Sequence, residues 1–200
     1  MEKKNDKNFY AMISRMKFIN RWGLMRNTIT ENIAEHSFET AVIAHGLAVI
    51  GNTYFGKNID ADKVAVMAMF HDTSEIITGD MPTPVKYFEP GIEEAYKNVE
   101  TAAVNKLLTA LPDGLRECYK EIYNENENNK ELYRYVKAAD KISALIKCIE
   151  EKNMGNTDFI SAQESTLNAV KSMNMEEAEY FITNFLPPYS NTLDEQAAMD

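Results

Sequence analysis

The chain has 200 residues, of which 44% are hydrophobic and 26% are charged. This length and balance predict one folded domain over residues 1–200 and exclude the fibrous and disordered classes. Acidic residues number 31 against 21 basic ones, so the formal net charge is −10. An acidic protein is a poor partner for nucleic acid, because a phosphate backbone is bound through clustered Lys and Arg. The scarcity of turn-forming residues, 8 Gly and 6 Pro, favours helices over an all-β fold.

No segment has the pattern of a membrane anchor or a secretion signal. The longest apolar stretch, residues 41–50, is interrupted by His45 and Gly46 and is far shorter than the ~20 residues that a membrane span needs. Residues 1–8 are charged and polar, without the apolar core of a signal peptide. The two cysteines, Cys118 and Cys148, lack metal-site spacing. We therefore expect a cytoplasmic protein with reduced thiols and no membrane partner.

Helical periodicity predicts an all-α chain. Apolar residues at helical spacing predict a helix over 9–19, and the polar segment 21–34 predicts an ordered loop. Two helices follow, over 35–50, closed by Gly51 and Asn52, and over 64–77, with Asp60 as a candidate N-cap. The two prolines of segment 81–84 predict a fixed loop. Further helices are predicted over 91–111, 115–124, 130–152, 157–173 and 175–186, followed by Pro187, Pro188 and a short acidic tail.

The adjacent pair His71 and Asp72 lies within the otherwise apolar helix 64–77. Burying two such polar side chains costs several kcal/mol unless a partner satisfies them, and a bound cation would do so. Imidazole and carboxylate ligands suit Mn²⁺, Co²⁺, Fe²⁺ or Zn²⁺. Glu75, four residues after His71, is predicted on the same helix face, beside such a metal. The alternative is a satisfied core histidine with an exposed aspartate.

A third acidic candidate, Asp140, lies on the predicted helix 130–152. Its neighbours on that helix are largely apolar on both faces, so a carboxylate here is expected to be paired or metal-bound. A salt bridge to Lys137 or Lys141 is the alternative partner.

Two histidines lie on the predicted helix 35–50. His36 follows the polar loop directly, so it can lie at the mouth of a pocket; the alternative is a solvent-exposed histidine at a helix start. His45 is nine residues later, about 180° around the helix at ~100° per residue, so both cannot face one metal. We interpret His45 as a core histidine or one that supports a ligand from behind.

In chain order, His36, His71-Asp72 and Asp140 form the pattern H…HD…D, which resembles the HD-domain superfamily of metal-dependent phosphohydrolases. The text around these residues resembles the bacterial 5′-deoxynucleotidases of the YfbR type. That text comprises segments 20–22, 24–27, 30–32, 35–37, 70–72, 74–75, 78–80 and 82–88. The resemblance covers about residues 9–151.

This resemblance implies a compact single-domain helical bundle, usually a homodimer, that hydrolyses deoxyribonucleoside 5′-monophosphates to deoxyribonucleosides and phosphate. It also implies one divalent metal ion, such as Co²⁺ or Mn²⁺. The implied metal ligands are His36, His71, Asp72 and Asp140, of which Asp72 and Asp140 also contact the substrate.

The resemblance assigns the remaining roles residue by residue. Glu75 matches the catalytic acidic residue, which acts beside Asp72. Arg21 and Trp22 match residues that hold and orient the phosphate, although without the resemblance Trp22 would be interpreted as a core residue. The sugar-side pocket is matched by Asp80, Met81, Pro82 and Thr83.

The sequence departs from the family pattern at two positions. Gly23 stands where relatives carry proline, which would loosen the phosphate loop. Lys141 follows Asp140, which leaves a competing ion pair open when metal is absent.

The predicted mechanism uses a metal-activated water to attack phosphorus in line, with Glu75 moving a proton and Arg21 offering a planar fork to phosphate oxygens. Two alternatives remain. One is another HD phosphohydrolase, acting on nucleoside triphosphates or guanosine tetraphosphate; such enzymes surround the metal with more basic residues, whereas only Arg21, Arg26 and Lys86 lie near these motifs. The other is a catalytically silent HD module for binding or dimerisation, which would lack Glu75 or a ligand.

Overall fold

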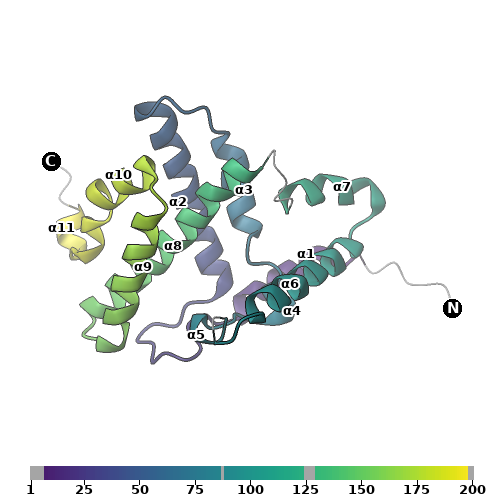
Figure 1. Ribbon diagram of the computed structural model, residues 1–200, viewed down its shortest axis with the longest axis horizontal. Coiled ribbons are helices and arrows are strands. Elements are labelled where there is room, and N and C mark those ends of the chain that lie inside the picture. Colours follow the sequence, from purple (N-terminus) through teal and green to yellow (C-terminus); the bar gives the residue numbers. More distant parts are fainter. Residues whose placement is uncertain (1–6, 87, 124–128, 198–200) are drawn as a thin grey trace.

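A computed structural model describes residues 7–86, 88–123 and 129–197. Throughout these ranges the regular structure is helical, with only an isolated bridge between Asn20 and Asn32 (Figure 1). The all-α prediction is therefore confirmed. The helices are α1 (Phe9–Ile13), η1 (Ser14–Phe18), α2 (Ile33–Tyr54), α3 (Ala61–Phe70), α4 (Glu75–Thr78), α5 (Thr83–Lys86), α6 (Ile92–Thr109), α7 (Asp113–Ile122), α8 (Lys130–Asn153), η2 (Thr157–Phe159), α9 (Ile160–Ser172), α10 (Glu176–Asn184), η3 (Pro187–Ser190) and α11 (Leu193–Ala197), where η marks a 3-10 helix.

The main core lies where α2, α3 and α8 pack together, with α9 and α10 against one side (Figure 1). Leu47 of α2, Val64 of α3 and Ile142 of α8 have no exposed surface. Burial of each such side chain stabilises the fold by about 1.5–3 kcal/mol. These helices form the rigid frame on which the candidate site is built.

A second, smaller core joins α1, α6 and α7, which lie together on the opposite side of the molecule from α9 (Figure 1). Its buried members are Phe9, Leu107, Leu108 and Leu111. The short helix α4 packs on α6, so it belongs with this second core. The chain passes from the first core to the second between α3 and α4.

Helix α2 differs from the prediction at both ends. It begins at Ile33 because Asn32 caps it. The Asn32 side chain accepts a hydrogen bond from the Glu35 amide, and the Glu35 carboxylate accepts one from the Asn32 amide. It also continues through Gly51, where termination was expected. A Cβ at Gly51 would lie 2.9 Å from Glu177 Oε1 and 3.1 Å from Tyr135 Oη. This glycine therefore permits close packing and does not end the helix.

The predicted helix 64–77 is wrong in its middle. Helix α3 ends at Phe70, residues 71–74 form turns, and α4 begins at Glu75. The Thr73 hydroxyl donates to the Phe70 carbonyl, a local side-chain bond that competes with the helical ladder. Glu75 is therefore not one helical turn beyond His71; it starts a separate helix.

Two other loop predictions need correction. Segment 81–84 leads into the short helix α5, because Pro84 lies in the first turn, where its missing N–H costs nothing. The predicted acidic tail contains η3 and α11. The predicted end of a helix at Asn124 lies outside the described residues.

Both cysteines are free, Cys118 exposed and Cys148 buried. Within the described ranges, no helix is both long and apolar enough to cross a membrane.

Candidate active site

The four residues of the H…HD…D pattern meet at one place. His36 comes from the first turn of α2, His71 and Asp72 from the turn after α3, and Asp140 from the middle of α8. One ligand atom from each of His36, His71 and Asp72 lies within 4.8 Å of the others. Asp140 Oδ1 lies 3.1 Å from His36 Nε2 and 4.0 Å from His71 Nε2. Residues separated by up to 104 positions are thus joined by the crossing of three helices.

Hydrogen bonds orient both imidazoles. His36 Nδ1 lies 3.0 Å from the Ser143 hydroxyl, which donates its own proton to Glu39, so Nδ1 is assigned as the donor. His71 Nδ1 lies 2.6 Å from the Ala68 carbonyl, which only accepts. Both rings therefore turn Nε2 toward the carboxylates, as metal-binding histidines do.

The cluster requires a positive charge. His71 Nε2 is buried without a hydrogen-bond partner, and Asp72 Oδ2 lies 3.2 Å away without hydrogen-bond geometry. Burial alone would lower the pKa of His71, but Asp72 and Asp140 outweigh it and raise this pKa to about 9. The same two carboxylates that raise the pKa of His71 would attract a bound cation. Two imidazoles and two carboxylates, with no thiolate, fit a divalent ion such as Mn²⁺, Co²⁺, Fe²⁺ or Zn²⁺.

Several sequence alternatives are resolved by these positions. His36 is fully buried and is not a surface histidine. Asp140 pairs with His36 and lies 3.9 Å from Arg21 Nη2, and no ion pair among the described residues joins it to Lys137 or Lys141. The prediction that His45 is a core or supporting histidine is wrong: its side chain is 48% exposed, 3.8 Å from Asp62. His45 lies about 180° around α2 from the buried His36, and it therefore faces solvent.

Arg21 and Trp22 lie in the loop between η1 and α2. Arg21 Nη1 and Trp22 Nε1 each donate to Glu31 Oε2 at 2.9 Å. Trp22 adopts a left-handed backbone with φ of 60°, and its amide donates to Asp80 Oδ2 at 3.2 Å. The centroid of its ring lies 5.3 Å from that of Phe159. The residue is partly exposed, so Trp22 is not a simple core residue. Glu31 therefore binds the loop to itself, and Asp80 ties it to the segment after α4.

Glu75 is buried at the start of α4, and its Oε2 has no hydrogen-bond partner. Burial first, and then the charges of Asp72 and Asp80, raise the pKa of Glu75 to about 10. Burial and the neighbouring carboxylates thus both favour the neutral form of this carboxyl. A buried acid next to candidate metal ligands can donate or accept a proton in a reaction.

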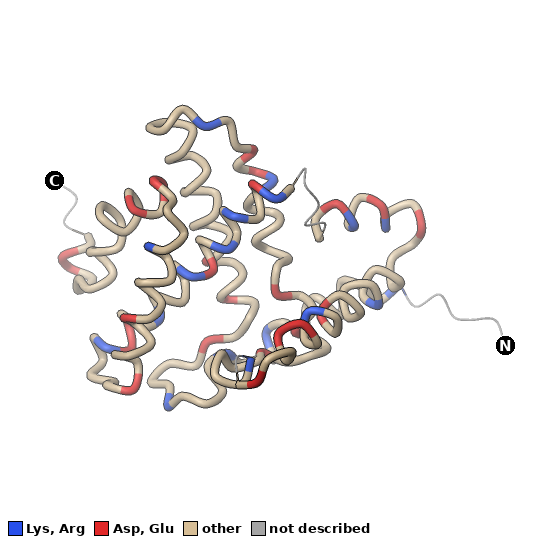
Figure 2. The backbone as a smooth tube through the Cα atoms, in the orientation of Figure 1, with Lys and Arg blue, Asp and Glu red and all other residues tan. Residues whose placement is uncertain are grey.

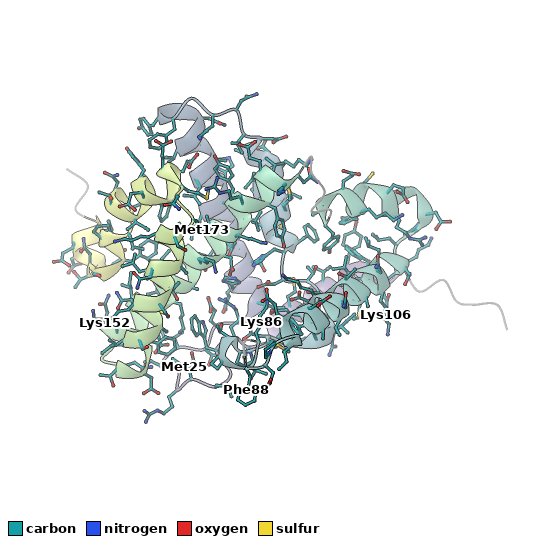
Figure 3. The ribbon with its side chains drawn as sticks, viewed as in Figure 1. Met25, Lys86, Phe88, Lys106, Lys152 and Met173 are labelled. Atoms are coloured by element: carbon teal, nitrogen blue, oxygen red, sulfur yellow. The ribbon has the colours of Figure 1, made fainter. Side chains whose placement is uncertain are left out.

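The expected sugar-side residues lie at the edge of the molecule. Asp80, Met81 and Pro82 are half-buried, whereas Thr83, the first residue of α5, is exposed. Figure 3 shows Lys86 and Phe88 of this region on the same side of the molecule as Met25 of the Arg21 loop. The link from the Trp22 amide to Asp80 joins these two segments directly.

Sequence reasoning assigned no role to three carboxylate or hydroxyl groups that support the site. Ser143 is three residues after Asp140 and Glu39 three after His36, so helical spacing could have placed each on the face of its neighbour. Glu31 lies in the quoted segment 30–32, opposite Arg21 across the Asn20–Asn32 bridge. That pairing is a tertiary feature with no local signal.

The fold of this chain resembles that of solved HD-domain proteins. It superimposes with a TM-score of 0.80 on an HD-domain phosphohydrolase from Listeria innocua, at 21% identity, covering 95% of this chain and 92% of the other. The cyanophage S-2L HD phosphohydrolase DatZ, solved with dA and one catalytic Zn²⁺ ion, gives a TM-score of 0.63 at 18% identity, covering 88% and 95%. The fold is therefore that of HD-domain phosphohydrolases.

The family follows from closer relatives. The family model described as 5′-deoxynucleotidase YfbR-like matches residues 8–189. A 5′-deoxynucleotidase of Photobacterium profundum is 45% identical over 187 residues, covering 94% of this chain and 96% of the relative. The 5′-deoxynucleotidase YfbR of Shigella boydii is 45% identical over 190 residues, covering 94% of each. This chain belongs to the YfbR-like 5′-deoxynucleotidase family, which confirms the resemblance read from the motifs.

Proposed function

We propose that this protein is a metal-dependent phosphomonoesterase that hydrolyses deoxyribonucleoside 5′-monophosphates to deoxyribonucleosides and inorganic phosphate. One observation carries the proposal: the Nε2 atoms of His36 and His71 cluster with two partly exposed carboxylates beside the guanidinium of Arg21. Membership of the 5′-deoxynucleotidase family supports the reaction, and the dA bound in the related cyanophage structure is in keeping with it.

His36, His71, Asp72 and Asp140 would hold one divalent ion, with Co²⁺ or Mn²⁺ as the candidates to test first. When bound, such an ion supplies Lewis-acid chemistry, activating water and neutralising phosphate charge. The carboxylates of Asp72 and Asp140 would also face the substrate from the same cluster.

Arg21 is proposed to hold the phosphate. Nη1 is engaged by Glu31, whereas Nη2 lies 3.9 Å from Asp140 Oδ1 and is turned to the cluster. A guanidinium offers parallel N–H donors that match two phosphate oxygens, which a lysine would not. Trp22 would orient the same group through its position in the loop.

Glu75 is proposed as the residue that moves the proton. The buried carboxyl of Glu75 has an unpaired Oε2, so in its protonated form it can donate to the departing 5′ oxygen, and the carboxylate then formed can accept the proton that the attacking water releases. Among the described residues, the cluster holds no other buried acid with a raised pKa and an unpaired oxygen.

Asp80 is proposed to recognise the sugar. Its Oδ2 accepts from the Trp22 amide, which leaves Oδ1 for the 3′-hydroxyl. Packing by Met81, Pro82 and Thr83 would leave no room at the 2′ position and so select deoxyribose.

Longer phosphate chains fit the site less well. Arg26 pairs with Asp158 at 2.6 Å on the surface, and Lys86 lies over the Tyr96 ring at 5.5 Å. Neither adds a second cation beside Arg21, so triphosphate and guanosine tetraphosphate substrates are the less favoured alternative. A silent binding module is disfavoured because Glu75 and all four candidate ligands are present.

We also propose a homodimer in the cytoplasm. The exposed face of α2 carries Phe38, Val42 and Val49. From residue 40 to its end at Tyr54, α2 bears no Lys, Arg, Asp or Glu (Figure 2). A second copy of this face would cover it. Sedimentation of the wild-type chain tests the dimer, and the free thiols of Cys118 and Cys148 are in keeping with a reducing compartment.

The deciding experiment measures phosphate release from deoxyribonucleoside 5′-monophosphates, ribonucleoside 5′- and 3′-monophosphates, deoxyribonucleoside triphosphates and guanosine tetraphosphate, with and without Mn²⁺ or Co²⁺. We expect metal-dependent turnover of the first group alone. Equal turnover of ribonucleotides would refute the sugar selectivity, and no turnover of any compound would favour the silent module.

A further inference from the structure

Glu31 contacts both residues to which phosphate binding is assigned and also approaches a candidate metal ligand. Its Oε2 accepts from Arg21 Nη1 and from Trp22 Nε1, both at 2.9 Å, and its Oε1 lies 3.9 Å from His36 Nδ1. The side chain is only 12% exposed. One carboxylate thus connects two phosphate-side residues with the first candidate metal ligand.

The backbone fixes Glu31 opposite Arg21. The Arg21 amide donates to the Glu31 carbonyl at 2.9 Å, and the Ile33 amide donates to the Ile19 carbonyl at 3.0 Å. These bonds flank the Asn20–Asn32 bridge and close the loop at its base. The carboxylate of Glu31 is therefore held in a set register with the guanidinium.

Without Glu31, Arg21 has a competing partner. Its Nη2 lies 3.9 Å from Asp140 Oδ1, so release of Nη1 would let the guanidinium form a two-bond pair with that carboxylate. Such a pair would occupy both the phosphate-binding fork and a candidate metal ligand. Glu31 keeps one edge of Arg21 occupied and leaves the other edge toward the cluster.

Trp22 needs the same support. A left-handed backbone costs a non-glycine residue about 1–3 kcal/mol and persists only where the surroundings hold it. The amide of Trp22 is held by Asp80 and the indole N–H by Glu31. The Trp22 carbonyl in turn accepts from the Met25 amide and from Asn27 Nδ2. Glu31 therefore supplies the polar contact that holds the indole ring, while the other bonds hold the backbone.

We propose that Glu31 is a positioning residue, which aligns the Arg21 guanidinium and the Trp22 ring so that substrate phosphate meets a prearranged fork. This inference rests on the proposed function, because it assigns Glu31 a part in binding the same phosphate. It adds a residue that acts through Arg21 and Trp22 and does not itself touch the reacting atoms.

The test is a double-mutant cycle that combines Glu31→Gln with Arg21→Ala. Glu31→Gln keeps the size of the side chain and removes its charge; Glu164→Gln, an exposed glutamate on α9, is the matched control. We expect Glu31→Gln to lower kcat/KM for a deoxyribonucleoside 5′-monophosphate about tenfold or more, chiefly through KM. In the Arg21→Ala background the same change is expected to cost about threefold or less, because the guanidinium that Glu31 aligns is gone and only the Trp22 ring remains to be positioned. An equal loss in both backgrounds would mean a merely structural role and would overturn the proposal.

A second readout is independent of turnover. Trp22 is the sole tryptophan of the chain, so fluorescence excited at a wavelength that the tyrosines do not absorb reports this site. Glu31→Gln should change the Trp22 emission in metal-free protein and weaken quenching by inorganic phosphate in Mn²⁺-loaded protein, whereas Glu164→Gln should do neither. If wild type fails to hydrolyse nucleotides, the proposed function falls, yet these titrations still judge Glu31; unchanged emission and phosphate affinity would refute its positioning role.

Discussion

Glu75 and Asp140 share the site, but their surroundings predict different losses. Burial and nearby carboxylates raise the pKa of Glu75 and favour its neutral form, so Glu75→Gln keeps a neutral side chain of the same shape. We expect metal to stay bound while turnover falls about 10²–10⁴-fold. Asp140 pairs with His36, and Asp140→Ala is expected to lose the metal together with activity. Metal analysis of the purified variants, together with phosphate release, checks both expectations.

The two variants serve as each other's controls. Unchanged metal content in Asp140→Ala would contradict its role as a ligand, and loss of metal in Glu75→Gln would place that carboxyl among the ligands.

Gly51 shows how one missing side chain sets helix packing. Glu177 is buried and accepts a 2.6 Å hydrogen bond from Tyr135, and both groups lie against the Gly51 backbone. We expect Gly51→Ala to destabilise the fold by about 1–3 kcal/mol through overpacking. Gly46→Ala is the matched control on the same helix: it meets nothing within 4 Å and should stabilise by at most ~1 kcal/mol, the helix-propensity gain. Urea unfolding measures both, and equal effects would argue against the packing role of Gly51.

At the scale of elements, helix α8 anchors the Arg21 loop through the buried carboxylate of Glu151. Burial alone would raise the pKa of Glu151, but hydrogen bonds from Lys147, from Asn156 and from the amides of Thr28 and Ile29 outweigh it and lower this pKa to about 2. A pKa that is lower in the folded than in the unfolded chain stabilises the fold above the unfolded value, near 4.5, and this stabilisation is lost as the pH falls toward 2.

Glu151→Gln removes that titration. Wild type should be the more stable protein at pH 7, and the difference in unfolding free energy should narrow as the pH is lowered from about 5 toward 2. Chemical unfolding over this pH range measures the difference. A constant difference would show that the Glu151 carboxylate does not titrate differently in the folded protein.

Most elements could be predicted because their signals are local. The apolar stripes of α2, α3 and α8 and the pairing of His71 with Asp72 are visible in the sequence, and so is the H…HD…D order. The break after Phe70 was missed because the hydrogen bond from the Thr73 hydroxyl to the Phe70 carbonyl competes with the helix, although the apolar pattern continues through it. The end expected at Gly51 was wrong because Glu177 is brought against this glycine only by tertiary packing. Glu31 was given no role because the bridge that sets it opposite Arg21 is not visible in the sequence.

At the scale of the molecule, the net charge of −10 opposes an anionic substrate before it reaches the site. Salt screens this long-range repulsion, whereas contacts within the site are screened less. At saturating Mn²⁺ we expect kcat/KM for a deoxyribonucleoside 5′-monophosphate to rise about twofold or more as ionic strength increases from 10 to 150 mM. Steady-state kinetics at several salt concentrations check this, and a steady fall would mean that attraction by the local cations dominates.

Because the chain has two cores, a bound metal ion would join them. His36 and Asp140 belong to helices of the main core, whereas the turn at His71 and Asp72 leads into α4, which packs with the second core. An ion bound by all four residues would therefore link the main core to the second core where α3 leads into α4. Chelation should therefore speed amide hydrogen exchange in α4 and α6 while α2 and α8 stay protected. If chelation speeds exchange equally in all helices, the protein unfolds as one cooperative unit. If exchange speeds only in α4 and α6, the supply of metal controls how often the second core opens while the main core stays folded.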